Sequence, residues 1–250
     1  MTIAIEQSES VVHSRERRHE LGQFLTPPPV ANFMASLFET RWRELDLLDA
    51  GAGNGELSAA LIRRLCASHN PPNRISVTAY ELDGAMIESL RVTMRDCEWE
   101  CERAGIQFSA TVLNEDFIAA AVPLIRGDLF GAHPLRFNAA IVNPPYRKIR
   151  SESSARLWLR SAGIETSNLY TGFVSLITKL LSERGELVAI TPRSFCNGPY
   201  FKPFRTDFLE AMSLRRLHVF ESWSAAFNRD TVLQENIIVR ASSCTSFSVR

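Results

Sequence analysis

The fold is decided by the stretch DLLDAGAGNGE, which spans residues 46–56. Its first half, Asp46–Ala50, is an apolar run that predicts a buried strand, and Glu56 opens a segment with helical periodicity. The glycines between them allow a tight turn and a close approach of the backbone to a ligand. A helix that begins directly after such a turn offers unpaired N–H donors. The stretch is therefore typical of a ligand-binding turn between a strand and a helix, although an ordinary glycine-rich turn without a ligand could have the same sequence pattern.

The charges around this turn restrict the ligand. Its glycines, Gly51, Gly53 and Gly55, follow a GxGxG spacing, whereas a dinucleotide site has GxGxxG with a pyrophosphate on the helix N-terminus. Asp49 and Glu56 flank the glycines, and two carboxylates would repel a pyrophosphate. They suit a cationic ligand, such as the sulfonium and amino group of S-adenosylmethionine.

Outward from this turn, short apolar runs alternate with segments of helical periodicity. Strands are expected at Asp46–Ala50, Ile75–Glu81, Phe108–Leu113, Ala139–Val142, Glu186–Thr191, Leu217–Phe220 and Asn236–Arg240. Helices are expected at Val30–Arg43, Glu56–Ser68, Gly84–Ala104, Asp116–Ile125, Leu169–Ser182 and Phe204–Met212. This alternation predicts an α/β fold with a doubly wound, mostly parallel seven-stranded sheet. Only a loop joins the last two strands, so an antiparallel hairpin is expected to end the sheet.

Acidic residues follow the second and third strands, at the edge where such sheets bind ligands. Glu81-Leu82 ends the second strand, and a carboxylate there can accept hydrogen bonds from both ribose hydroxyls. Asp116-Phe117 follows the third strand, and it can take the amino group of an adenine and stack on its ring. Each feature is common alone. Their order after successive strands indicates a nucleoside cofactor.

The sharpest motif is Asn143-Pro144-Pro145-Tyr146, which follows the fourth strand. Two prolines remove two backbone donors and hold the loop rigid. The Pro144 carbonyl and the Asn143 side-chain carbonyl then form two fixed acceptors for the hydrogens of one planar amino group. Such contacts localise the lone pair on the nitrogen and make it nucleophilic, while Tyr146 offers a face for the ring.

An adenine in duplex DNA must leave the base stack to reach this loop. Stacking on one aromatic ring returns roughly 1–3 kcal/mol per base, so a second aromatic residue is expected on the other face. We interpret Phe227, on the loop between the last two strands, as that residue. The rival candidates Phe195, Tyr200 and Phe201 are interpreted as core or loop packing.

In the order of these motifs, residues 21–240 resemble the gamma-class adenine-N6 DNA methyltransferases of restriction–modification systems. The resemblance implies a Rossmann-like class I methyltransferase fold, S-adenosylmethionine as cofactor, DNA as substrate and transfer to N6 of a flipped-out adenine. Gly22–Pro28 matches a segment that precedes the glycine turn in this family. That match implies contacts to the methionine end of the cofactor from Phe24, Thr26 and Pro27.

Carried over position by position, the pattern implies two groups of site residues. At the cofactor it implies Asp49, Gly51, Gly53, Glu81, Leu82, Asp116 and Phe117. At the target base it implies Asn143, Pro144, Pro145, Tyr146 and Phe227. The family normally continues into a target-recognition domain, which we expect on another polypeptide or on a longer form of this chain. Residues 1–20 are expected to form a charged arm and residues 21–250 the catalytic domain.

Composition sets the remaining expectations. The 28 basic and 28 acidic side chains cancel, so strong DNA binding by this segment alone is not expected, apart from local basic patches such as Arg147, Lys148 and Arg150. The scattered cysteines and the lack of a long apolar run fit a cytoplasmic protein with no membrane contact. Cys97 and Cys101 lie four apart without His or Cys partners, so no metal is expected.

Three alternatives stay open. The same loop chemistry would serve another planar amine, either a glutamine amide in a protein or an amino group in RNA. The fold could instead bind cofactor or DNA without catalysis inside a restriction or phage-defence complex. A dehydrogenase is the third alternative, and the GxGxG spacing disfavours it.

Overall fold

The computed structural model describes residues 25–39, 42–126, 136–220 and 235–244. They contain a seven-stranded sheet in the order β3-β2-β1-β4-β5-β7-β6. The strands are β1 (Glu44–Ala50), β2 (Arg74–Tyr80), β3 (Gln107–Leu113), β4 (Phe137–Val142), β5 (Leu181–Pro192), β6 (Met212–Val219) and β7 (Asn236–Ser243). Strands β1 to β5 are parallel, and β7 is antiparallel to both β5 and β6. The predicted mostly parallel sheet with a terminal antiparallel hairpin is confirmed.

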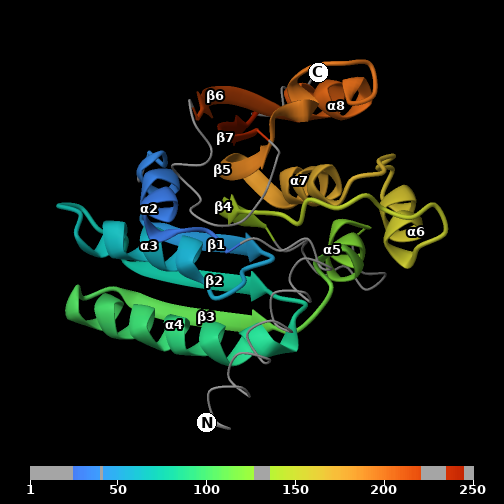
Figure 1. The fold of residues 1–250 in the computed structure, drawn as a ribbon. Helices are drawn as coiled ribbons and strands as arrows, with labels where there is room; N and C mark the ends of the chain where they lie inside the picture. The colour runs from blue at the N-terminus through green and yellow to red at the C-terminus, as the bar shows by residue number, and fades with distance from the viewer. Residues whose placement is uncertain (1–24, 40–41, 127–135, 221–234, 245–250) are drawn as a thin grey trace, which may run out of the picture.

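Helices cover both faces of this sheet (Figure 1). One face carries α2 (Pro28–Ser36), α3 (Glu56–Cys66) and α4 (Gly84–Arg103). The other carries α5 (Phe117–Arg126), α6 (Ser154–Ser161), α7 (Leu169–Leu180) and α8 (Lys202–Ala211). In β1, Leu45 and Leu47 face the first layer while Leu48 and Ala50 face the second, as strand alternation requires. The central strands are buried on both sides, which explains the apolar run Ala139–Val142 in β4.

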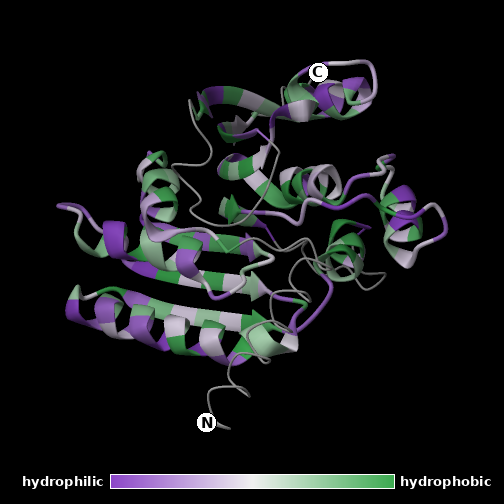
Figure 2. Cartoon of the chain, viewed as in Figure 1, coloured by the Kyte–Doolittle hydropathy of each residue, from purple (hydrophilic) through white to green (hydrophobic). Residues whose placement is uncertain are grey.

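The helices that cover the sheet differ in polarity. Figure 2 shows α5 mostly hydrophobic, whereas hydrophilic residues run along α4. Helix α5 packs against α6 and α7 and is covered, while α4 exposes one long side to solvent. The polarity of each helix therefore follows how much of its surface is covered.

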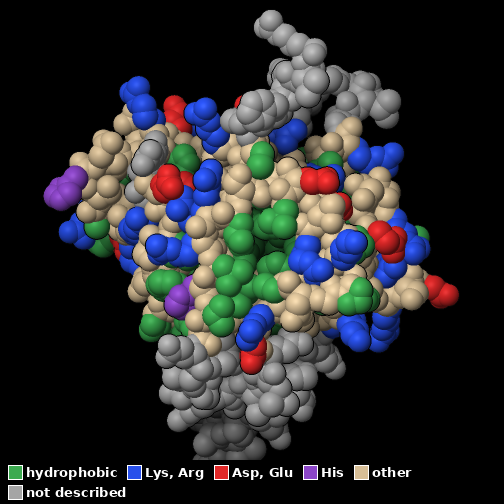
Figure 3. Space-filling view, turned by 90° about the horizontal axis from the view of Figure 1, so that it is seen from above, with side chains coloured by type: hydrophobic (Ala, Val, Ile, Leu, Met, Phe, Trp, Pro, Cys, Tyr) green, Lys and Arg blue, Asp and Glu red, His purple; other side chains and the backbone are tan. Residues whose placement is uncertain are grey.

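The edge strand β6 and the neighbouring α8 expose apolar side chains at one end of the sheet. Leu209 of α8 and Leu214, Leu217 and Val219 of β6 are exposed. Figure 3 views this end and shows hydrophobic side chains gathered at its centre, with Lys and Arg side chains around them. This apolar patch lies away from the carboxyl ends of β1 to β4.

Helix α2 ends at Ser36, although the sequence pattern predicts a helix to Arg43. Two carbonyls near its C-terminus, those of Ala35 and Phe38, accept hydrogen bonds from the Arg64 guanidinium at 2.7 and 3.0 Å. A side chain from α3 therefore satisfies groups that another helical turn would have paired. This contact spans more than 25 residues of sequence and could not be read from local periodicity.

Other boundaries differ from the prediction where local pattern is weak. Helix α6 and the 3₁₀ turn Arg193–Cys196 were not predicted. Strand β5 starts at Leu181 rather than Glu186, because Leu181 pairs with Phe137 before an irregularity in the register. The first half of β6, Met212–Arg215, lies on the sheet edge and mixes apolar with polar residues, of which only Met212 is buried, so it shows no clear alternation to recognise.

Candidate active site

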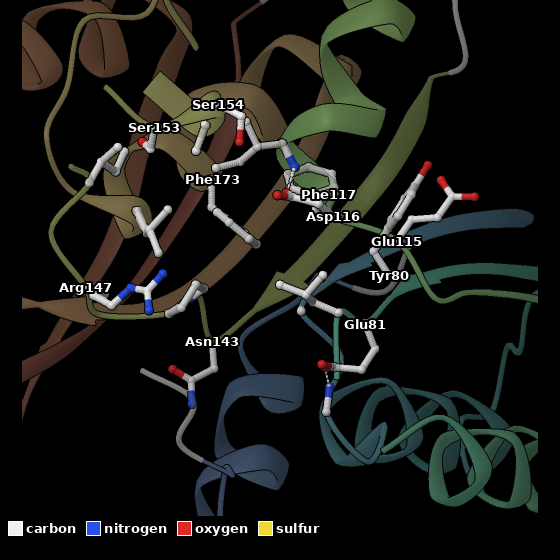
Figure 4. A pocket seen from close by; sticks show the side chains of 18 of the residues that line it. Tyr80, Glu81, Glu115, Asp116, Phe117, Asn143, Arg147, Ser153, Ser154 and Phe173 are labelled. Atoms are coloured by element: carbon white, nitrogen blue, oxygen red, sulfur yellow. Dashed lines mark hydrogen bonds between the residues drawn. The ribbon is translucent and has the colours of Figure 1, made fainter. Parts of the chain in front are cut away.

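The carboxyl ends of the central strands surround a cavity of about 700 Å³ (Figure 4). This is the edge at which doubly wound sheets bind ligands. Eight of the predicted site residues line it: Gly51, Gly53, Glu81, Leu82, Asp116, Phe117, Asn143 and Pro145. Residues that the sequence places up to about 90 positions apart thus share one cavity wall.

The glycine turn after β1 needs its glycines. Gly51, Gly53 and Gly55 all have positive φ angles, of 77°, 58° and 82°. A Cβ on Gly55 would lie 2.8 Å from Cδ1 of Leu90, closer than packed carbons approach. The Gly51 N–H donates to the Tyr80 carbonyl at 2.9 Å, which fixes the turn against the end of β2. The turn is therefore held open toward the cavity by backbone geometry.

Glu81 is held at the cavity wall by two backbone donors. Its carboxylate oxygens accept hydrogen bonds from the N–H groups of Gly53 and Asp83, both at 2.7 Å. The residue is only 1% exposed, yet its side chain lines the cavity (Figure 4). A carboxylate has about four acceptor positions, so it can take hydroxyl donors in addition to these two. Leu82 lies beside it and presents an exposed apolar side chain.

Asp49 lies behind the glycine turn and faces α3. It is fully buried, and Oδ2 accepts a hydrogen bond from the Ser58 hydroxyl at 2.5 Å. Its Oδ1 has no hydrogen-bond partner among the described residues. Burial raises the pKa of Asp49 to about 7; the Ser58 hydrogen bond opposes this shift, and the charge of Glu81 adds to it. The carboxyl therefore holds a proton until close to neutral pH.

Asp49 and Glu56, the two carboxylates that flank the glycines in sequence, do not line the cavity. Glu56 pairs with Arg63 at 2.8 Å on the surface of α3. The acidic groups that do line it are Glu81, Glu115 and Asp116. A direct contact between Asp49 and a ligand stays a prediction.

An aromatic cluster forms the floor between β2, α5 and α7. Phe117 packs edge-on against Tyr80 with ring centroids 5.3 Å apart, and its ring is tilted against that of Phe173, with centroids 5.1 Å apart. Asp116 accepts a hydrogen bond from the Ile118 N–H at 2.8 Å, which fixes its carboxylate at the start of α5. Burial raises the pKa of Tyr80, and the charge of Glu115 adds to this shift. The predicted Asp–Phe pair is thus an ordered part of the wall.

Asn143 is held at both ends of its amide. The Nδ2 donates to Oγ1 of Thr26 at 3.0 Å, and the Oδ1 accepts from the hydroxyl of Tyr146 at 2.8 Å. Thr26 therefore determines which way the amide oxygen faces, a role different from the cofactor contact that the resemblance implies. The Tyr146 hydroxyl also lies 3.2 Å from the Ile190 carbonyl. Burial raises the pKa of Tyr146, so its hydroxyl stays protonated and remains a donor.

The rest of the motif surrounds this amide. Pro145 lines the cavity, and Pro144 is buried. Tyr146 is half-buried and does not line the cavity; its ring lies edge-on to Tyr170, with centroids 6.4 Å apart. The stacking face predicted for Tyr146 therefore stays a prediction.

The other predicted aromatic residues divide into two groups. Phe24 and Phe227 lie outside the described residues. Phe195, Tyr200 and Phe201 all pack against neighbouring rings, as predicted, although Tyr200 is also 61% exposed. Pro27 is the extended N-cap residue of α2 and does not line the cavity, and the helix begins at Pro28.

Several lining residues were missed as site residues. They are Leu25, Tyr80, Met86, Glu115, Ile118, Arg147, Lys148, Ile149, Arg150, Ser153, Ser154, Ala155, Leu169 and Phe173. Phe173 lies four positions after Leu169, so the two share a face of α7 and could have been paired on helical spacing. Arg147, Lys148 and Arg150 were recognised only as a basic patch.

The two ends of the cavity have opposite charge. Glu81, Glu115 and Asp116 lie at the end formed by β2 and β3, while Arg147, Lys148 and Arg150 lie beyond β4. Figure 4 shows Glu115 and Asp116 on one side and Arg147 extending from the other toward the space between Asn143 and Phe173. We call these the acidic end and the basic end.

The acidic end fits a nucleoside with a cationic group. The Glu81 carboxylate can accept ribose hydroxyls, and Asp116 can accept an amino group. A Cβ on Gly53 would lie 3.2 Å from Cδ2 of Leu25, so a side chain there would crowd the cavity wall. The acceptors therefore suit a ligand that donates from ribose hydroxyls and from an adenine amino group, and S-adenosylmethionine carries both.

The cysteines lie away from this cavity and do not form a metal site in the described part of the chain. Cys97 and Cys101 are buried, and Cys101 Sγ lies 3.7 Å from Cys66 Sγ. Within the residues that the structure describes, no three His, Cys, Asp or Glu side chains are grouped to hold a metal ion. No helix among them is long and apolar enough to cross a membrane.

Comparison with known sequences identifies related proteins. Residues 90–227 match a family described as Eco57I restriction-modification methylase. The type II methyltransferase M.PstI of Providencia stuartii is 44% identical over 221 residues, which cover 88% of this chain and 43% of that protein. M.BsuBI of Bacillus subtilis is 42% identical over 226 residues, which cover 89% and 44%. The chain thus spans less than half the length of these relatives.

Solved structures share the fold at low sequence identity. A class I S-adenosylmethionine-dependent methyltransferase from Listeria monocytogenes superposes with a TM-score of 0.66 at 13% identity, over 91% of this chain and 63% of that one. The methyltransferase subunit of a type I restriction-modification system from Streptococcus thermophilus gives 0.63 at 18% identity, over 89% and 45%. The architecture is therefore that of class I methyltransferases.

Proposed function

The chain belongs to the Eco57I restriction-modification methylase family, and from this membership we propose that it methylates the N6 amino group of adenine in DNA, with S-adenosylmethionine as methyl donor. One observation carries the proposal. A single cavity joins an acidic, glycine-lined end to the amide of Asn143 in the Asn143–Tyr146 motif. Donor and acceptor of a methyl group can therefore meet in one cavity.

The acidic end holds the cofactor in this proposal. Glu81 accepts the ribose hydroxyls, Asp116 accepts the adenine amino group, and Phe117 and Phe173 bound the ring pocket. The glycine turn lets the backbone approach the methionine part closely. When bound, S-adenosylmethionine supplies an electrophilic methyl group on its sulfonium. The protein's own contribution is to fix the direction from which an amine can approach that methyl group.

The target amine is held by Asn143 and the rigid loop after it. Asn143 Oδ1 and the Pro144 carbonyl accept its two hydrogens, which localises the lone pair on the nitrogen. Thr26 fixes the amide so that the oxygen, rather than the nitrogen, is presented. The Tyr146 hydroxyl already donates to Asn143 Oδ1. When the target amine binds, this hydroxyl either turns to the Ile190 carbonyl, 3.2 Å away, or shares Oδ1 with the amine. Oriented dipoles of this kind provide catalysis without a tuned general base.

A base in duplex DNA reaches this amide only after it leaves the stack, at a cost of a few kcal/mol. Stacking on Tyr146 is expected to return roughly 1–3 kcal/mol. Phe227 is the candidate for the second face. Because M.PstI extends over more than twice the matched length, we further propose that target recognition comes from a domain outside residues 21–250.

Transfer of a labelled methyl group tests the proposal. The protein is incubated with methyl-labelled S-adenosylmethionine and, in separate reactions, unmethylated DNA, RNA and a mixture of soluble proteins. We expect label in DNA alone, and the Asn143→Ala variant should transfer it about 10²–10³-fold more slowly. Label in RNA or protein but not in DNA would favour the other planar amines, and no transfer to any acceptor would favour a non-catalytic role.

A further inference from the structure

The basic end of the cavity is formed by the segment that directly follows the catalytic motif. Arg147, Lys148 and Arg150 all line the cavity. Lys148 and Arg150 are exposed side chains, while Ile149 between them is buried. Alternation along an extended segment therefore turns Lys148 and Arg150 away from the core and toward the opening.

This basic segment is anchored by backbone hydrogen bonds. The Ile149 N–H donates to the Ser167 carbonyl at 2.7 Å, and the Leu169 N–H donates to the Arg147 carbonyl at 2.8 Å. An isolated bridge pairs Lys148 with Asn168. The segment is thus tied to the start of α7, so its charges are carried on a fixed backbone.

The N-terminus of α6 adjoins the same opening. Ser153 and Ser154 line the cavity, and Figure 4 shows both on its wall. The Ser153 hydroxyl and N–H both donate to the Arg150 carbonyl, at 2.8 and 3.1 Å, which joins the helix start to the basic segment. A helix N-terminus carries a partial positive charge that adds to that of nearby cations.

The basic segment differs from the arginines further along α6. Arg156 and Arg160 both pair with Glu165, so their charges are balanced within the protein. Among the described residues, neither Lys148 nor Arg150 forms an ion pair with a carboxylate. Their charges are therefore available to an anion that approaches from solvent.

We propose that Lys148, Arg150 and the N-terminus of α6 bind DNA phosphate groups next to the adenine that enters the cavity. This proposal rests on the proposed function, since it places the DNA strand that carries the target adenine at the basic end of the cavity. It also explains how a chain without net charge can hold DNA, because the positive charge is placed at the point of entry. Phosphate contacts position the strand and carry no sequence information.

The salt dependence of DNA binding tests this assignment. The double variant Lys148→Ala/Arg150→Ala is compared with the wild type by methyl transfer to unmodified plasmid DNA at several salt concentrations. The slope of log affinity against log salt is negative, and each lost phosphate contact makes it shallower by about 0.9. For the double variant we therefore expect the steepness of this slope to decrease by roughly 2. The KM for DNA should rise at least about tenfold at low salt, with the Kd for S-adenosylmethionine unchanged.

A matched control variant removes two positive charges from a face of the protein away from the cavity. Arg91 and Arg103 are exposed on α4, so Arg91→Ala/Arg103→Ala should leave the slope and KM as in the wild type. The assignment is wrong if the two double variants behave alike. It is also wrong if Lys148→Ala/Arg150→Ala weakens cofactor binding while the slope stays constant, since the anion would then be the cofactor carboxylate. A wild type that transfers nothing to DNA would instead overturn the proposed function.

Discussion

The acidic and basic ends of the cavity differ in how their polar groups are held. At the acidic end, both oxygens of Glu81 accept hydrogen bonds from backbone N–H groups, and the glycine turn is fixed to the end of β2. Toward the basic end, the Asn143 oxygen accepts a hydrogen bond from the side chain of Tyr146. Backbone donors stay in place when a ligand enters, whereas a hydroxyl can rotate to another acceptor.

This difference indicates a division of work. The acidic end is arranged in advance for a ligand that must bind in each reaction cycle. The Asn143 oxygen becomes available to an amine only when the Tyr146 hydroxyl turns away from it or when the oxygen accepts both hydrogen bonds. Substitutions at the acidic end should therefore change cofactor affinity, and substitutions around Asn143 should change transfer to DNA.

The largest effect is expected for Asn143→Ala. Removal of one oriented group that stabilises developing charge costs about 10²–10³-fold in rate. We expect a loss of this size in single-turnover methyl transfer, with cofactor affinity measured by calorimetry unchanged. Asn143→Asp keeps an oxygen at the same place and should retain part of the activity. Weaker cofactor binding by Asn143→Ala would contradict the assignment of cofactor affinity to the acidic end alone.

A pH effect on stability is expected from Asp49, which lies behind the acidic end. Its pKa is raised to about 7, so the folded protein keeps a proton that the unfolded chain releases near pH 3.8. Stability should therefore fall as pH rises from about 4 to about 7, by on the order of a few kcal/mol. The Asp49→Asn substitution removes the titrating carboxyl and with it this pH dependence.

The measurement for this prediction is denaturant unfolding of the wild type and Asp49→Asn between pH 4 and 8. The variant should gain stability relative to the wild type up to about pH 7 and then run parallel to it. The Ser58 hydroxyl can still donate to the amide oxygen, so a constant offset is acceptable. Parallel curves over the whole range would show that Asp49 is ionised in the folded protein.

Glu81→Gln is expected to weaken the acidic end. The substitution removes the charge and replaces one acceptor oxygen with a donor that faces the N–H of Gly53 or Asp83. Loss of hydrogen bonds to a charged group costs about 1.5–3 kcal/mol, which raises the Kd for S-adenosylmethionine roughly 10- to 100-fold. Transfer at saturating cofactor should stay near the wild-type rate. A fall in that rate with an unchanged Kd would place Glu81 in the chemical step.

Tyr146 is expected to give the smallest effect. Tyr146→Ala removes the predicted stacking face and should raise the KM for DNA about tenfold. Tyr146→Phe keeps the ring and removes only the hydroxyl that bonds to Asn143, so its KM should stay within about threefold of the wild type. Equal defects in the two variants would show that the hydroxyl, and not the ring, is what matters.

The acidic end could be predicted from the sequence because each of its groups directly follows a strand. Gly51, Glu81 and Asp116 need only the rule that parallel strands meet at their carboxyl ends. Asn143 was found in the same way. Local order along the chain was enough for these positions.

The contacts around Asn143 could not be predicted in this way. Its hydrogen bond to Thr26 joins residues 117 positions apart, and no periodic pattern encodes such a pair. Helix α6 was missed because Ser154–Ser161 is short and has one fully buried residue, Leu159. The Ser153 cap before it was the available signal. The basic segment was visible as charge, but its place in the cavity depends on pairing with residues 167–169.

The most direct test of the central claim is the identity of the methylated atom. Unmethylated DNA is treated with the protein and methyl-labelled S-adenosylmethionine, digested to nucleosides and separated by chromatography with mass detection. The account predicts that the label elutes as N6-methyladenine nucleoside, and that Asn143→Ala forms this peak about 10²–10³-fold more slowly. Label on cytosine, or on a ring nitrogen of adenine, would contradict it.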